Sequence, residues 1–169
     1  MPPPGRRPNL ALRDSAVESR EDDMGEQRQG GADPRLVVEA MTRKDAGDLE
    51  GFLELFAPDC EIVFPGAVLR GIREWRQFVS AYFEAFPNGR YELQRLEPVG
   101  QTVFAEGVWS AVHRGTLRTP SGEVPPTGRR VAVRFALVVE VRNGRMASVH
   151  NYHDVLDFMA QLGLAPAAA

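Results

Sequence analysis

The chain has 169 residues, of which 43% are hydrophobic and 25% charged, and its formal net charge is -3. These values are ordinary for a globular protein of one domain and exclude a chain that is disordered throughout. There is no basic stripe to favour nucleic acid as a partner, and no window approaches the roughly 18 to 20 apolar residues of a membrane span.

The first 31 residues combine prolines, glycines and mixed charges with almost no aromatic or β-branched residues. Such a composition cannot bury enough apolar surface to order itself, so residues 1–31 are predicted to be a disordered tail. No apolar segment follows the arginines of this tail, as a secretory signal would require. Cys60 is the only cysteine, so an intrachain disulfide is impossible. We therefore expect a cytoplasmic protein.

Two helices in succession are predicted after the tail. Asp33 and Pro34 are typical of a helix start, with Asp33 as the N-cap and Pro34 at the first helical position. Gly47 and Asp48 predict the start of a second helix, which Pro58 is expected to end.

A short strand and a strongly amphipathic helix are predicted next. The strand covers residues 60–66, where a proline and a glycine stop it. The helix covers residues 71–86, because large apolar residues recur there every three or four positions, namely Ile72, Trp75, Phe78, Val79, Tyr82, Phe83 and Phe86.

Four strands follow, in the order of an antiparallel meander. The first three cover residues 91–99, 102–116 and 129–141, and a loop rich in turn formers at 119–128 interrupts them. Asn143 and Gly144 predict a two-residue hairpin into a last strand.

The last strand is expected at residues 146–153, followed by a short helix at 155–162. Helices that precede a run of antiparallel strands indicate the α+β class, with helices on one face of a curved sheet. The ordered domain is predicted to cover residues 32–164, and residues 165–169 to form a C-terminal tail.

Several short motifs resemble those of the SnoaL-like polyketide cyclase family, within the nuclear-transport-factor-like and ketosteroid-isomerase-like superfamily. They are AFPN at 85–88, Trp109, HRG at 113–115, PPTG at 125–128, NGRM at 143–146, Asp154 and QLGL at 161–164. The resemblance covers roughly residues 33–164 and implies a cone-shaped sheet with a pocket inside. The chain departs from the family at Ala111 and Val112, where the family usually has Gly-Thr, and at Ser148, where it often has an acidic residue.

Strand alternation groups the polar residues of the last strand into two sets. Ser148, His150, Tyr152 and Asp154 share one face, whereas Val149, Asn151 and His153 share the other. Because His150 and His153 then point in opposite directions, a histidine metal site is not expected. If the first set and Trp109 with His113 of the second long strand face the cone interior, one cavity is predicted to collect Trp109, His113, His150, Tyr152 and Asp154.

Such a cavity suits acid–base chemistry without a cofactor. A carboxylate walled by aromatic rings has a raised pKa and can exchange protons with a carbon acid, while an imidazole or phenol stabilises the oxyanion. The family resemblance places Asp154 as general acid/base, and His113 is the second candidate catalytic residue. The candidate substrate-binding residues are Trp75, Tyr82, Trp109, Phe135, His150 and Tyr152. The structural alternatives are an N-cap for Asp154, a hydrogen-bonded strand histidine for His113 and a core role for the aromatic residues.

The leading hypothesis is a SnoaL-like enzyme that acts on a small apolar carbonyl compound by intramolecular aldol cyclisation, isomerisation or dehydration. One alternative is a ligand-binding or assembly module with the same fold and no turnover. A further alternative, epoxide hydrolysis, requires an Asp-Arg-Asp constellation inside the cone, and Arg134, the only strand arginine to nominate, is predicted to lie on the outer face with Glu140. That outer face also carries Ala132, Ala136 and Val138, so we expect a homodimer.

Overall fold

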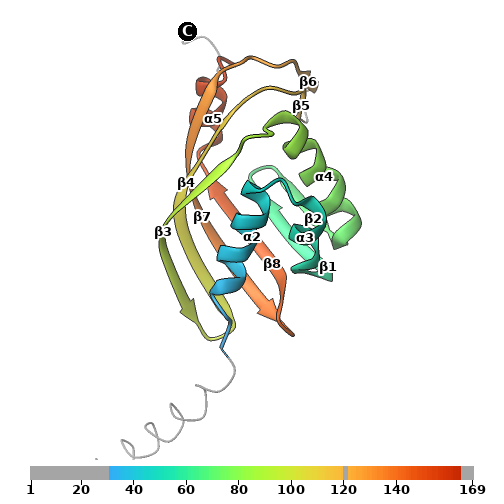
Figure 1. Cartoon of the computed structure of the whole chain (residues 1–169), viewed down its shortest axis with the longest axis vertical. Helices are drawn as coiled ribbons and strands as arrows, with labels where there is room; N and C mark the ends of the chain where they lie inside the picture. The colour runs from blue at the N-terminus through green and yellow to red at the C-terminus, as the bar shows by residue number, and fades with distance from the viewer. Residues whose placement is uncertain (1–30, 120–121, 165–169) are drawn as a thin grey trace, which may run out of the picture. The chain divides into compact units, whose positions relative to one another are not determined.

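The computed structural model describes residues 31–119 and 122–164, which contain a curved, mainly antiparallel sheet and helices (Figure 1). The predicted α+β class, with helices on one face of a curved sheet, is thereby confirmed. The predicted tails lie outside the described residues except for Gly31. Within the described part of the chain, no helix is both long enough and apolar enough to cross a membrane.

Six strands form the main sheet in the order β2-β1-β8-β7-β4-β3. All neighbours are antiparallel except β1 and β8, which are parallel. The bounds are Phe56–Phe64 for β1, Ala67–Arg70 for β2, Arg90–Val99 for β3, Thr102–Val112 for β4, Arg130–Arg142 for β7 and Arg145–His153 for β8. Two short strands, β5 at Leu117–Thr119 and β6 at Gly122–Val124, pair separately.

The helices pack on one face of this sheet and leave the other face without a helix among the described elements (Figure 1). They are α2 at Arg35–Asp45, α3 at Leu49–Glu54, α4 at Gly71–Ala85 and α5 at Val155–Gln161. Buried side chains from α2, α3 and α4 meet the odd-numbered residues of β4 and β7, including Val103, Ala105, Phe135 and Val139. The core therefore lies on the concave side, where the strand alternation of β4 and β7 places their apolar residues.

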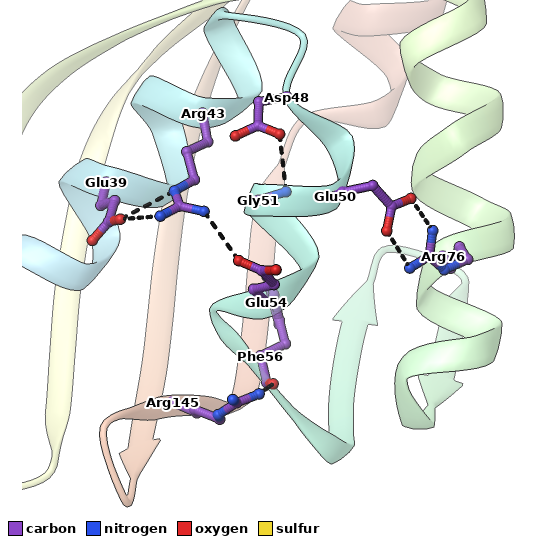
Figure 2. Close-up of polar contacts among 9 residues, drawn as sticks. All are labelled: Glu39, Arg43, Asp48, Glu50, Gly51, Glu54, Phe56, Arg76 and Arg145. Carbon is purple, nitrogen blue, oxygen red and sulfur yellow. Dashed lines mark hydrogen bonds and ion pairs between the residues drawn. The ribbon is translucent and has the colours of Figure 1, made fainter.

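The start of α3 depends on a glycine beneath its cap. The Asp48 carboxylate accepts a hydrogen bond from the Gly51 N–H at 2.9 Å (Figure 2). A Cβ atom at Gly51 would lie 2.1 Å from Asp48 Oδ2, so any other residue would displace the cap. The predicted start of this helix is confirmed.

Exposed ion pairs connect the three helices at their surface. Arg43 of α2 donates to Glu39 and lies 3.6 Å from the carboxylate of Glu54 at the end of α3 (Figure 2). Glu50 of α3 accepts a hydrogen bond at 2.8 Å from Arg76 of α4. Because such exposed pairs contribute about 0 to 1 kcal/mol each, they fix the orientation of the helices more than they stabilise the fold.

Several predicted boundaries were wrong, including the end of the second long strand, which is Val112 instead of residue 116, and the N-cap of the first helix, which is Pro34 instead of Asp33. The second helix ends at Glu54 instead of Pro58, because β1 already begins at Phe56. Pro58 is tolerated inside β1 since the register to β8 shifts between Phe56 and Glu61, where an N–H is not required for the ladder. Residues 117–119 and 122–124, which flank the predicted loop or lie within it, form the hairpin β5–β6 because Leu117 is anchored in the core.

Candidate functional site

An aromatic cavity lies between the helices and the concave face of the sheet. It holds about 50 Å³ of free space and is partly open to solvent, so it is smaller than the roughly 300 to 1,000 Å³ of usual small-molecule sites. Four of the predicted binding residues, Trp75, Tyr82, Trp109 and Phe135, line it. The other lining residues are Lys44, Phe64, Phe78, Val79, Tyr91, Val133, Asn151, His153 and Phe158.

The other two predicted binding residues do not reach this cavity. His150 and Tyr152 point to the helix-free face, where Tyr152 is 54% exposed and its hydroxyl lies 3.4 Å from His150 Nδ1. The interior face of β8 is the one with Val149, Asn151 and His153, so the predicted convergence was wrong for His150 and Tyr152. The apolar Val149, which is buried, is the sequence signal for this face.

Asp154 lies at the end of β8, outside the set of residues that line the cavity. Its side chain is exposed, and its Oδ1 accepts a hydrogen bond from the Asp157 N–H at 3.0 Å, which makes it the N-cap of α5. The structure therefore confirms the alternative in which Asp154 caps the last helix. Direct catalysis by Asp154 stays a prediction, but the placement of its carboxylate in the cavity was wrong.

We expect Asp154→Asn to keep both stability and activity, because asparagine caps a helix about as well as aspartate. Asp154→Ala should lose roughly 1 kcal/mol in the free energy of unfolding. Urea denaturation of the two variants beside the parent measures this difference. A large loss of turnover in Asp154→Asn at parental stability would restore Asp154 as the acid/base.

His113 is fully buried but lies outside the cavity lining, at the end of β4. Its ring packs against Phe86 at a centroid distance of 5.1 Å, and its Nδ1 accepts a hydrogen bond from the Thr127 N–H at 3.2 Å. Burial lowers the pKa of His113, with an opposing contribution from the backbone of Gly115. These contacts connect the 125–128 loop to the core, so the structure favours the alternative of a structural strand histidine.

His153 is the imidazole that the structure places in the cavity. Its Nδ1 lies 2.7 Å from Asn151 Oδ1, so Nδ1–H donates and Nε2 keeps its lone pair. Burial lowers the pKa of His153, while the charge of Asp154 opposes this shift. Burial therefore favours the neutral ring, which is the form that a general base needs.

Lys44 of α2 and Tyr91 of β3 supply further polar groups to the same cavity. Lys44 Nζ donates to the Tyr91 hydroxyl at 2.7 Å and lies 5.7 Å from the centre of the Phe52 ring and 5.1 Å from that of Tyr91. Part of the lysine side chain reaches solvent, but its amino group is surrounded by protein, and this burial lowers its pKa to about 8, against the charge of Asp45.

Sequence reasoning missed Lys44, although a signal was present. Lys44 is the single lysine among the 20 lysine and arginine residues of the chain. Arginine is used at every other Lys/Arg position of the sequence, whereas lysine, whose pKa responds readily to burial, occupies a position that lines the cavity, where no described arginine lies. Tyr91 was recognised only as the start of a strand.

The lining of the cavity also bears on the other reactions considered. No arginine and no carboxylate lines it in the described part of the chain, so the Asp-Arg-Asp set required for epoxide hydrolysis is not assembled there. Arg134 and Glu140 are exposed, as predicted. Among residues 31–119 and 122–164, no three histidine, cysteine, aspartate or glutamate side chains gather into a group that could hold a metal ion.

Comparison with known proteins identifies the family. The model of the SnoaL-like domain matches residues 37–149. The chain belongs to the SnoaL-like domain family. The matched segment includes Lys44, Trp75 and Tyr91 and ends before Asn151 and His153. No curated protein sequence matches this SnoaL-like chain.

Solved structures with the same fold share few residues with this SnoaL-like protein. AclR from Streptomyces galilaeus, a "putative hydroxylase", has a TM-score of 0.68 at 19% identity and covers 85% of this chain and 99% of its own. A "putative SnoaL-like polyketide cyclase" from Jannaschia sp. CCS1 has a TM-score of 0.68 at 18% identity, covering 78% and 92%. A protein with a ketosteroid isomerase-like fold from Catenulispora acidiphila, in complex with trimethylamine, has a TM-score of 0.65 at 20% identity, covering 79% and 95%.

Proposed function

We propose that this SnoaL-like protein is a cofactor-independent enzyme that transfers protons on a small, mainly apolar carbonyl compound, with His153 as general base. The observation that carries the proposal is the imidazole of His153, which lies 2.7 Å from Asn151 Oδ1 through its Nδ1 and lines a cavity of aromatic side chains. Loss of solvation favours the neutral ring, and the hydrogen bond to Asn151 leaves Nε2 available. His153 thus takes the role that the sequence suggested for Asp154.

The reaction proposed begins with removal of a proton from the carbon next to a carbonyl group. His153 Nε2 takes this proton, and the C–H electron pair becomes the enolate, whose negative charge lies mainly on oxygen. The enolate then attacks a second carbonyl of the same molecule, closing a ring by aldol addition, or takes the proton back at another carbon. The imidazolium returns the proton to the product oxygen or carbon, so the enzyme ends in its starting form.

The aromatic lining supports a flat, ring-containing substrate. Trp75 and Phe78 are stacked, Phe78 and Tyr82 are stacked, and Trp109 of β4 packs against Tyr82 at a centroid distance of 6.1 Å. Aromatic walls of this kind favour flat apolar molecules through large contact areas. Polyketide-type compounds satisfy this description, in keeping with the polyketide cyclase named among the structural neighbours.

Proton exchange tests the proposal without knowledge of the natural substrate. The bicyclic ketone 2-tetralone is incubated with the protein in D₂O, and loss of its α-proton signals is followed by NMR. We expect exchange above the buffer rate, saturating with ketone concentration. Saturable binding of the ketone without exchange above the buffer rate would contradict general-base chemistry. It would support the alternative of a non-catalytic binding module, which is also favoured by the structural contacts of Asp154 and His113.

We also propose that two copies pair through the helix-free face of the sheet. Phe104 is 44% exposed there and lies opposite Val138 of β7. Exposure of a large apolar side chain to water is unfavourable, and burial in an interface removes this penalty. Light scattering at micromolar concentration is expected to give the mass of a dimer. Phe104→Glu should give a monomer, and a parent that is monomeric at this concentration would remove the proposal.

A further inference from the structure

The polar groups around Lys44 are hydrogen-bond donors with no matching acceptor. Lys44 Nζ carries three N–H bonds and uses one, toward the hydroxyl of Tyr91. The Tyr91 hydroxyl accepts this bond, and its own hydrogen has no acceptor among the described residues. Burial raises the pKa of Tyr91, so the hydroxyl keeps that hydrogen throughout the physiological range.

Trp75 adds a third donor to the same space. Its side chain is 3% exposed, and its indole N–H is buried without a hydrogen-bond partner in the described part of the chain. Lys44, Tyr91 and Trp75 line the cavity together, and they also line an adjoining hollow of about 60 Å³ between α2 and the sheet. A buried donor with no partner is costly, so a ligand that supplies an acceptor here removes that penalty on binding.

The charge of Lys44 also has no carboxylate paired with it among the described residues. Neither hollow is lined by a described aspartate or glutamate, and the nearest carboxylate in sequence, Asp45, accepts from the Tyr91 backbone N–H at 3.1 Å. No ion pair within 4 Å involves Lys44, whereas the ion pairs of the described residues all use arginine. An ammonium group held in an apolar site without a counter-ion favours an anionic ligand.

We infer that Lys44, Tyr91 and Trp75 form an oxyanion-binding subsite, which selects aromatic ligands that carry one negatively charged oxygen, such as a phenolate, enolate or carboxylate. The inference deepens the proposed function, since it names the ligand class of the same cavity. The aromatic walls hold the ring system, and the donors of the three residues, which line the same space, are available to the charged oxygen. In the proposed reaction this oxygen is the one that gains charge when His153 removes the proton.

Paired ligands of equal shape test this subsite in the intact protein. The dissociation constants of 2-naphthoate and 2-naphthamide are measured by calorimetry at pH 7. We expect the carboxylate to bind at least about tenfold more tightly, because hydrogen bonds to charged groups are the stronger ones. In Lys44→Met the two ligands should bind within twofold of each other, while Tyr91→Phe and Trp75→Phe should each lose part of the preference. Equal binding by the parent, no binding of naphthoate, or an unchanged preference in Lys44→Met would overturn the subsite.

A second measurement needs no variant. In protein grown with ¹³C-lysine, the single lysine gives one ε-carbon signal, whose pH titration follows Lys44 directly. Bound naphthoate should move the midpoint to higher pH, whereas naphthamide should not. The titratable groups that line this site beside Lys44 are Tyr91 on β3, Tyr82 on α4 and His153 on β8. The charge of Asp45 acts on Lys44, and the charge of Arg90 acts on Asp45. If bound naphthoate leaves the titration midpoint of Lys44 unchanged, the subsite is contradicted. The ligand-binding and titration results do not depend on the proton-exchange assay, so they test the subsite even if that assay shows no exchange.

Discussion

Replacing His153 by glutamine is expected to slow the exchange of ketone α-protons at least about a hundredfold. Glutamine has nearly the size of histidine and forms hydrogen bonds, but it cannot accept a proton at neutral pH, and general-base groups typically contribute 10²- to 10⁴-fold in rate. In the parent, the rate should rise with pH to a plateau, with a midpoint below 6.5, because burial lowers the pKa of His153. The His153→Gln rate should lack this step.

His150→Gln is the matched control for this experiment. His150 belongs to the same strand, three residues before His153, but lies on the helix-free face. The same chemical change there should leave the exchange rate within about twofold of the parent. Melting curves of both variants show whether the fold is kept. If the two glutamine variants have equal rates, His153 is not the base, and proton transfer must be assigned to another residue of the cavity.

The contrast between His150 and His153 shows how far strand alternation alone can go. Alternation correctly separated the two histidines onto opposite faces, because side chains on a strand alternate with a period of two. It does not state which face is interior. A bulge near Ala147, where the register to β7 shifts by one residue, brings Met146 to the same buried face as Val149. Counting forward from Met146 without this bulge therefore gives the wrong face for His153.

The aromatic residues were predictable for a different reason. Trp75 and Tyr82 lie seven residues apart on α4, and Trp109 lies on the same face of β4 as the buried Ala105. Large rings in an amphipathic pattern must face the interior, so they line whatever space the interior leaves. Lys44 was not predictable by this route, since a lysine in a helix is normally assigned to solvent. Its position follows from packing between α2 and β3, which joins residues 47 positions apart in the sequence.

Lys44→Met is expected to make the protein more stable at pH 7 while removing the preference for anionic ligands. Burial lowers the pKa of Lys44 from its usual 10.5 to about 8, and one pKa unit corresponds to about 1.4 kcal/mol. The shift thus represents a penalty of up to roughly 3 kcal/mol, which solvent near the exposed part of the side chain reduces. Methionine removes this penalty but also the hydrogen bond to Tyr91, worth about 0.5 to 1.5 kcal/mol. We expect a net gain of about 1 to 2 kcal/mol.

The pH dependence of this gain separates charge burial from better packing. Because the pKa of Lys44 is lower in the folded state, the unfolded chain binds more protons between pH 8 and 10.5, and the parent recovers stability as pH rises through this range. The difference between Lys44→Met and parent should be full below pH 8 and clearly smaller at pH 9.5, as measured by urea denaturation at both values. Arg43→Met is the control, since it removes one positive charge from the same helix at an arginine paired with Glu39. It should give no gain. If the gain in the free energy of unfolding of Lys44→Met is equal at both pH values, Lys44 is not held as a buried charge. The proposed oxyanion subsite would then have no cationic donor.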